Sequence, residues 1–132
     1  MALQFADVIR VHQKEKAGLA PTQLPTGFYA DLNALIEQAR TEYERYAVDD
    51  PTSMRASQML SVLQKLRDFQ NEIVNIRTRK LLLIAHQSMC GGSPDKQMLV
   101  PVEVETLDTI IATLASLRAQ IRAETASEKK DA

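Results

Sequence analysis

Three side chains in this sequence could bind a metal ion through nitrogen or sulfur, and they are His12, His86 and Cys90. His86 and Cys90 are four residues apart, so they would share one face of a helix. Structural zinc sites take four ligands, and two from one helix end with a distant third make a weak pattern. We therefore interpret the pair as a partly buried histidine and a free thiol, and we expect no metal and no cofactor.

A nucleophile needs a base beside it, and the sequence offers only Ser93 in a glycine-containing loop. Ser93 lacks the strand-turn-helix context of a nucleophile elbow, and Gly91-Gly92 is too short to cradle a phosphate. We interpret this segment as a flexible connection between helices. Glu103 and Glu105 would lie in the first turn of the next helix, where carboxylates complement the helix dipole. The sequence therefore predicts a protein that is not an enzyme.

The most unusual group is Arg77, Arg79 and Lys80, which directly precede the apolar run Leu81–Ala85. The cations could reach solvent along their apolar stems. They could instead pair with carboxylates across a helix or subunit interface, because an unpaired buried charge is costly. We predict that at least Arg79 is ion-paired or hydrogen-bonded near an interface.

The elements that carry these residues are predicted to be helices. Helix-forming residues dominate, and the chain has only four glycines and five prolines, which favours an all-α fold. The points at which glycine, proline and capping residues interrupt the helical pattern predict four helices. They run over about residues 2–16, 26–49, 51–89 and 101–123. Thr26 and Asp50 are predicted N-caps, with Pro51 at the first position of the long helix.

The helix predicted over 51–89 dominates the fold. Apolar residues repeat along it every three and then four residues, which predicts a seam against another helix. The seam consists of Met59, Val62, Leu66, Phe69, Ile73 and Ile76. The run Leu81–Ala85 is apolar all round, so we expect it to be buried on every side. Together these helices predict a helical bundle with one long central helix. The helical domain is predicted over residues 1–123, followed by a flexible tail or linker over 124–132.

The net charge and the lengths of the apolar runs limit where the protein can be located and what it can bind. Sixteen basic and seventeen acidic residues give a net charge of −1, so tight independent binding of nucleic acid is not expected. The longest apolar run is too short to cross a membrane. The single cysteine excludes an internal disulfide, and no signal peptide is evident. We expect a cytoplasmic location.

Several stretches resemble archaeal subunits of the GINS family. Leu24-Pro25-Thr26-Gly27-Phe28-Tyr29 before a helix resembles the "LP-x-x-FY" entry of these proteins. The stretch from Ile73 to Ala85 resembles their "I-x-x-(I/L)-R-x-R-K" block with its apolar run. Met98–Glu103 is similar to the "M-x-P-E-E" entry to the last helix, although Val102 and Val104 depart from its acidic pattern. Lys14-Glu15-Lys16 resembles the end of the first helix.

The resemblance implies a subunit whose helical domain comes first, in a scaffold without an active site that serves DNA replication. Such a scaffold joins the MCM helicase to a Cdc-forty-five or RecJ-like partner, and it forms a tetramer from sister subunits or copies of itself. It would be nucleoid-associated in an archaeal cytoplasm. The small β domain usual in this class is absent from the sequence, which leaves its contacts in doubt.

The same residues predict an assembly, because the apolar seam and the apolar run exceed what three shorter helices can cover. A homodimer, a homotetramer or a hetero-tetramer would each cover the apolar surface that remains exposed. The interface candidates are Phe28, Tyr29, Ile73, Ile76, Arg77, Arg79, Lys80, Leu81, Leu82, Leu83 and Ile84.

Two other functions stay open. One is a small helical enzyme of the chorismate mutase type, which also places arginines inside a bundle. Its pattern would have to be matched by Leu66, Arg67, Ile73, Ile76, Arg79, Lys80 and Gln87. The other is a helical adaptor of no assigned family.

Overall fold

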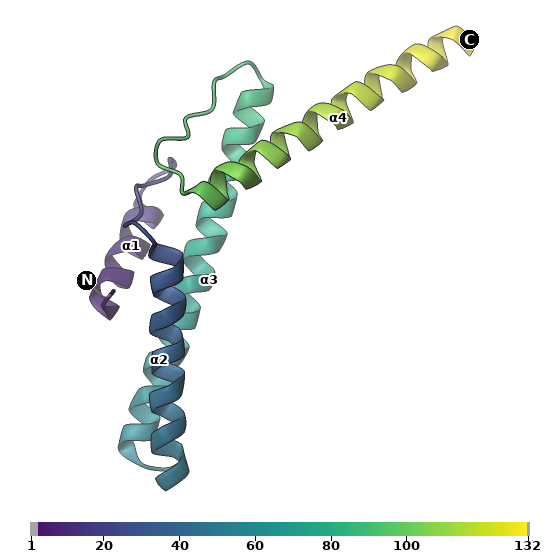
Figure 1. Cartoon of the computed structure of the whole chain (residues 1–132). Coiled ribbons are helices and arrows are strands. Elements are labelled where there is room, and N and C mark those ends of the chain that lie inside the picture. The colour runs from purple at the N-terminus through teal and green to yellow at the C-terminus, as the bar shows by residue number, and fades with distance from the viewer. Residues whose placement is uncertain (1–2, 132) are drawn as a thin grey trace. The chain divides into compact units, whose positions relative to one another are not determined.

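The computed structural model describes the backbone of residues 3–131 and the side chains of residues 3–124. This part of the chain forms four helices and no strand (Figure 1). They are α1 (Phe5–Ala17), α2 (Phe28–Asp49), α3 (Met54–Met89) and α4 (Pro101–Asp131). The predicted all-α fold with one long helix is confirmed, since α3 has 36 residues. The predicted start of the first helix at Ala2 lies outside the described residues.

The start of α2 differs from the prediction, because Gly27 and not Thr26 occupies the N-cap position. Gly27 adopts φ 70° and ψ 22°, the left-handed region in which side chains other than hydrogen are strained. The Phe28 N–H donates to the Pro25 carbonyl at 3.1 Å, which closes the turn that leads into the helix. The conformation of glycine therefore sets the entry to α2.

Substituting Gly27→Ala should destabilise the chain by about 1 kcal/mol, because alanine disfavours a positive φ. Gly18→Ala is the matched control, since Gly18 has an extended backbone and no atom within 4 Å of an added Cβ. That control should leave stability unchanged or raise it slightly. Urea unfolding followed by circular dichroism measures both, and equal midpoints for the two variants would contradict the expectation.

The start of α3 also differs from the prediction, because the helix begins at Met54 and not at Pro51. The Asp50 carboxylate accepts hydrogen bonds from the hydroxyl of Thr52 at 2.8 Å and from its backbone N–H at 3.0 Å. These bonds lower the pKa of Asp50 and fix a turn ahead of the helix. Ser53 then acts as the cap, with its hydroxyl oxygen accepting from the Ala56 N–H at 3.1 Å.

The fourth helix begins at Pro101 as predicted but continues to Asp131 rather than ending near Ala123. The predicted boundary between helical domain and tail therefore falls inside α4. A linker role for the residues from Glu124 onward stays a prediction, and the side chains beyond Glu124 lie outside the described residues.

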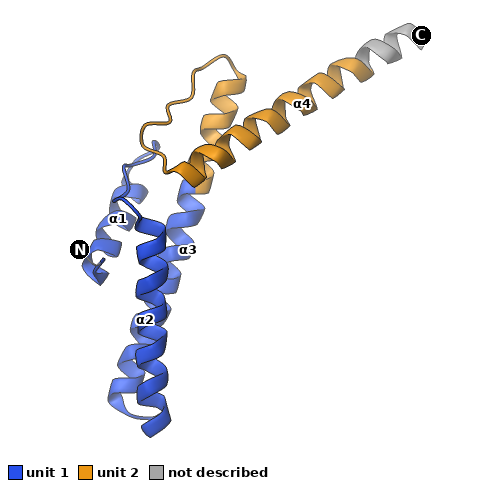
Figure 2. Cartoon of the chain, in the orientation of Figure 1, with its two compact units in different colours: residues 1–77 blue, residues 78–132 orange. Residues whose placement is uncertain are grey.

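The chain divides into two compact units, Met1–Arg77 and Thr78–Ala132, and the boundary lies inside α3 (Figure 2). Each unit is therefore built on a different length of one continuous helix. Among the helices of the described residues, none combines the length and apolar character needed to cross a membrane.

The first unit contains α1, α2 and the part of α3 up to Arg77. Its core takes the apolar face of α2, including Phe28, Leu32 and Ile36. The predicted seam of α3 is confirmed at Leu66 and Ile73, and its other members are half-buried. The buried apolar residues described in this unit are Val8, Val11, Leu24, Phe28, Leu32, Ile36, Ala39, Ala56, Leu63, Leu66 and Ile73.

The outer face of α2 is charged. Arg40 bridges Glu37 at 2.7 Å and Glu44 at 2.8 Å, the spacings that place side chains side by side on a helix. The hydrogen bond from Arg40 lowers the pKa of Glu37. Exposed pairs of this kind contribute little to stability. This contribution exists above the pKa of unfolded Glu37 and is lost as pH falls through the lowered value.

The second unit contains the last turns of α3, the connection over 90–100 and α4. Its core is small, with Leu81, Ala85 and Leu107 buried. The half-buried residues around that core are Ile84, Leu99, Ile110, Ile111 and Leu114. Gly91, at φ 101°, follows the end of α3, and the Gly92 N–H donates to the Gln87 carbonyl at 3.0 Å.

Candidate functional site

A buried ion pair joins α1 to α3 within the first unit. The Arg77 Nη1 donates to Glu15 Oε1 at 2.5 Å and to the Thr22 carbonyl oxygen at 2.6 Å. Glu15 is 0% exposed and Arg77 is 2% exposed. The Thr22 N–H also donates to Glu15 Oε1 at 3.1 Å, as does the Thr22 hydroxyl. The group therefore ties α1, the segment after it and α3 together.

The burial of Glu15 and Arg77 determines how much this ion pair contributes to the stability of the fold. Taking two charges out of water costs several kcal/mol per ion, and the cost is offset only when each charge keeps its partners. Glu15 and Arg77 meet that condition through each other and through Thr22. The arrangement is therefore costly to break, and it accounts for an arginine within the apolar seam of α3.

Sequence reasoning selected Arg77 but missed Glu15 and Thr22. A signal for Glu15 was present, because it follows Val8 by seven residues and Val11 by four, and both valines are buried. A carboxylate on a buried stripe requires a buried cation. Arg77 likewise follows the buried Ile73 by four. The two spacings together place Glu15 and Arg77 on buried stripes and so predict the pair. Either residue considered by itself would be interpreted as a surface charge.

The rest of the cationic block is divided between surface and interior. Arg79 is exposed, and among the described residues no ion pair or hydrogen bond holds its side chain. Arg77 thus makes the pairing predicted for Arg79, and a contact of Arg79 with another subunit stays a prediction. Lys80 is buried, at 5% exposed.

The other interface candidates also separate by burial. Phe28, Ile73 and Leu81 are buried, so their side chains act in the core of one chain and offer no surface to a partner. Tyr29, Ile76 and Ile84 are half-buried. Leu82 and Leu83 are 51% and 42% exposed. The expectation that the run Leu81–Ala85 is buried on every side is therefore wrong for the single chain.

The imidazole of His12 lies between an aromatic ring and a carboxylate. It is 5.1 Å from the ring of Phe69, and its Nε2 is 2.5 Å from Glu72 Oε2. Phe5 packs edge-on against the same Phe69 ring. His12 therefore serves the contact between α1 and α3. Cys90 is a free, exposed thiol, and no group of three metal-binding side chains occurs among the described residues.

A groove of about 940 Å³ lies beside α1 in the first unit. Val11 and Leu24 form apolar parts of its wall, and Arg10, Lys14 and Asp31 bring charges of both signs. Asp7, another wall residue, is already bound to the Gln4 N–H at 2.9 Å and to Arg10 at 3.4 Å. Mixed charge and internal pairing give the groove no preference for one kind of ligand.

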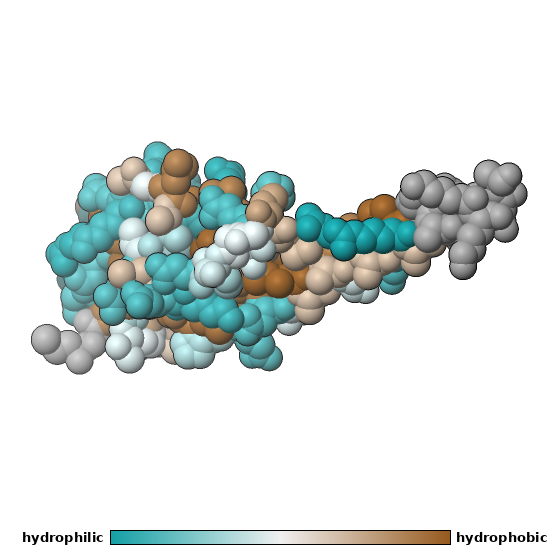
Figure 3. Space-filling view, turned by 90° about the horizontal axis from the view of Figure 1, so that it is seen from above, coloured by the Kyte–Doolittle hydropathy of each residue, from teal (hydrophilic) through white to brown (hydrophobic). Residues whose placement is uncertain are grey.

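The second unit exposes a set of large apolar side chains. Leu82, Leu83, Met98, Val102, Leu117 and Ile121 are between 41% and 59% exposed. Figure 3 shows brown and pale residues along α4 beside a narrow hydrophilic strip. Among the described residues of this unit, the buried cluster consists of Leu81, Ala85 and Leu107. Apolar contact area is thus what this unit offers to another molecule.

Comparisons of the chain with models of protein families, with curated proteins and with solved structures find no match.

Proposed function

We propose that this protein is a non-catalytic scaffold subunit that works by packing its second unit against other protein chains. In this proposal it belongs to a GINS-type complex of DNA replication, as a subunit with its helical domain first. It links the MCM helicase to a Cdc-forty-five or RecJ-like partner, in the archaeal nucleoid.

The observation that supports the proposal is that the second unit exposes more large apolar side chains than it buries in its core cluster. Its described part exposes six large apolar side chains and has three buried residues in its core cluster. In this proposal the exposed side chains belong to a surface that binds another chain, because large apolar surfaces of soluble proteins usually bind something. Leu82 and Leu83 belong to the stretch that resembles the GINS block, which supports that family as the setting.

The arginine of that block supports the proposal in a different way. Arg77 is held in the interior by Glu15, which belongs to the stretch Lys14-Glu15-Lys16 that also resembles GINS subunits. Two of the resembling stretches are thus joined by one buried ion pair. A pair of matched motifs that contact each other is a stronger indication of a shared fold than either motif alone.

Purification of the tagged chain from the cells that encode it tests the proposal. We expect the MCM helicase and a RecJ-like protein to be recovered with it. Leu82→Arg combined with Leu83→Arg should reduce that recovery by about tenfold or more, because the change places two charges in an apolar contact. Val48→Arg is the control, since Val48 is an apolar residue of the first unit and is 84% exposed.

Absence of both replication proteins from the wild-type purification would contradict the replication setting. Conversion of chorismate to prephenate by the pure chain would contradict the non-catalytic role. Undiminished recovery with the double variant would leave the scaffold function but remove Leu82 and Leu83 from its contact surface.

A further inference from the structure

The helix α1 is held to the rest of the first unit by few buried apolar side chains. Its buried apolar residues are Val8 and Val11, whereas the longer α2 buries four. Phe5 adds a half-buried ring that packs edge-on against Phe69 of α3. Burial of apolar area is the main favourable term that keeps one helix packed on another. This term therefore holds α1 in place less strongly than it holds α2.

Two further contacts of α1 with α3 are polar. His12 binds Glu72, and Glu15 binds Arg77. When α1 moves away from α3, water binds all four of these side chains and offsets most of the energy of the lost bonds. Substitution of one partner is different, because the charge that stays buried then has neither its partner nor water. These contacts are therefore costly to break by substitution and less costly to break by opening.

The connection between α1 and α2 is fixed mainly through the same ion pair. Residues 18–26 form no helix or strand, and a Cβ added at Gly18 would meet no atom within 4 Å. Thr22 ties this segment down, because its N–H donates to Glu15 and its carbonyl accepts from Arg77. A movement that separates Glu15 from Arg77 therefore also releases the connection.

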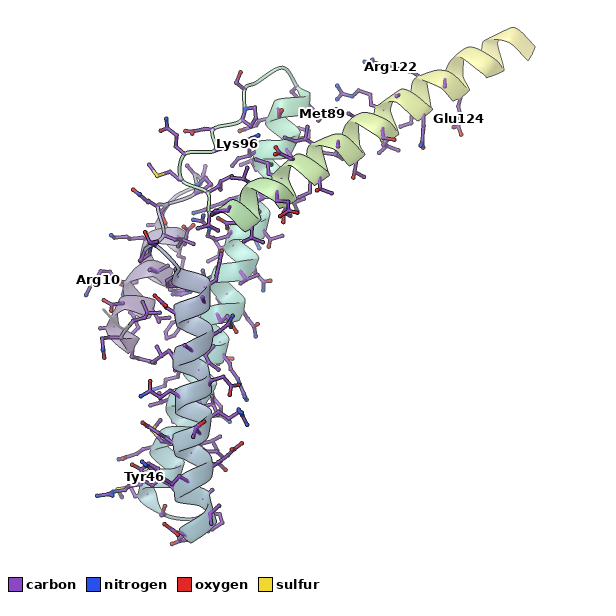
Figure 4. The ribbon with its side chains drawn as sticks, viewed as in Figure 1. Arg10, Tyr46, Met89, Lys96, Arg122 and Glu124 are labelled. Carbon is purple, nitrogen blue, oxygen red and sulfur yellow. The ribbon has the colours of Figure 1, made fainter. Side chains whose placement is uncertain are left out.

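The start and the outer side of α1 are bonded within α1 and its N-cap. The Gln4 N–H donates to Asp7 Oδ2 at 2.9 Å, and Arg10 pairs with Asp7 at 3.4 Å. Figure 4 shows Arg10 on the outer side of α1, and its side chain is 64% exposed. These bonds do not join α1 to α3, so they do not oppose a movement of α1 away from it.

We infer that α1 is a strap that opens away from α3 as one unit, at a lower free energy than the unfolding of the whole first unit. Local opening of this kind occurs in segments with few buried apolar contacts. Opening uncovers the ring of Phe69 and takes Glu15 and the Thr22 carbonyl away from the Arg77 guanidinium. The strap therefore determines whether this guanidinium is occupied within its own chain. The proposed packing of the second unit does not depend on this opening.

Native-state hydrogen exchange of the full chain, measured amide by amide at rising urea concentrations, tests the strap. An isolated helix with the 13 residues of α1 is marginal in water, so its amides exchange once it has left α3. The α1 amides should be protected at least about tenfold less than the most protected amides of α2 and α3. Their exchange should also depend less on urea, because opening exposes less surface than unfolding does.

A core substitution away from α1 separates opening from unfolding. Leu63 is buried in α3 and precedes Phe69 by about 9 Å along the helix at 1.5 Å per residue. Leu63→Ala should lower the protection of the α2 and α3 amides in the first unit by about thirtyfold or more, the effect of a core cavity. The α1 amides should keep their wild-type protection, because opening of α1 leaves the contacts of Leu63 intact.

Val8→Ala is the matched variant, because Val8 is also a buried apolar residue but lies in α1. Its contacts are lost in the opening of α1 and again in the unfolding of the whole unit. The protection of the amides should therefore fall by the same factor in α1, in α2 and in the part of α3 up to Arg77. The two variants together distinguish contacts that α1 breaks on opening from contacts that it leaves intact.

An equal loss of protection in α1, α2 and α3 with Leu63→Ala would overturn the inference, because α1 would then exchange only by unfolding of the whole unit. If Leu63→Ala does not fold, the wild-type urea series decides. Identical protection and identical urea dependence in α1 and α3 would overturn the inference by themselves. Neither result depends on the recovery of the MCM helicase, so failure of the strap leaves the proposed function in place, and the reverse also holds.

Discussion

Replacement of Arg77 by methionine should destabilise the folded chain by about 3–5 kcal/mol, the range for removing one partner of a buried ion pair. The variant leaves the Glu15 carboxylate at 0% exposure without the guanidinium that donates to it at 2.5 Å. It also removes the hydrogen bond to the Thr22 carbonyl. Urea unfolding at neutral pH, followed by circular dichroism, measures the loss as a shift of the midpoint.

Arg79→Met is the matched control, because Arg79 is exposed on the same helix two residues away. Its effect should stay within about 0.5 kcal/mol, as for most surface substitutions. The double variant Glu15→Met with Arg77→Met should recover much of the loss, since it leaves no unpaired buried charge. Equal midpoints for Arg77→Met and Arg79→Met would show that the buried pair does not stabilise the fold.

Phe28→Ala should destabilise the chain by about 3–5 kcal/mol, because it removes a buried ring and leaves a cavity at the start of α2. Phe28 is 1% exposed, and its ring packs edge-on against Tyr29 at 5.8 Å between centroids. Thermal unfolding followed by calorimetry measures the change. Val48→Ala at the other end of α2, 84% exposed, should change stability by less than about 0.5 kcal/mol.

A small effect of Phe28→Ala would contradict the burial of this ring. A large effect with unchanged partner binding in the remaining folded protein would place Phe28 in the core and not in a contact surface. The stretch Leu24–Tyr29 would then mark how α2 begins, which is the role that the left-handed Gly27 and the buried Leu24 already indicate.

Much of the fold could be predicted from the sequence because helical periodicity is a local signal. The apolar stripe of α2 and the seam of α3 repeat at the helical period, and Leu32, Ile36, Leu66 and Ile73 are buried accordingly. The helix starts were less predictable. Thr26 and Asp50 are good capping residues, but the caps lie at Gly27 and Ser53, where the turn geometry and not residue preference decides.

The candidate site was predicted less completely, because its contacts join residues far apart in the sequence. Only the spacing of Glu15 from the buried Val8 and Val11 distinguishes it from its exposed neighbours, and that spacing does not show which distant cation pairs with it. The run Leu81–Ala85 looks uniformly apolar, yet Leu82 and Leu83 remain exposed because the cluster around Leu107 covers only one side of this turn.

The distance along the chain between Glu15 and Arg77 has a consequence for folding kinetics. Their contact closes a loop of 62 residues, which includes all of α2 and most of α3. Helices form from local contacts, and a contact of this separation carries a large loop-closure entropy before it is favourable. We therefore expect the pair to form after the transition state, so that its free energy appears in the unfolding arm of a chevron plot. The ion pair then governs how long a folded chain survives, and has little influence on how fast it folds.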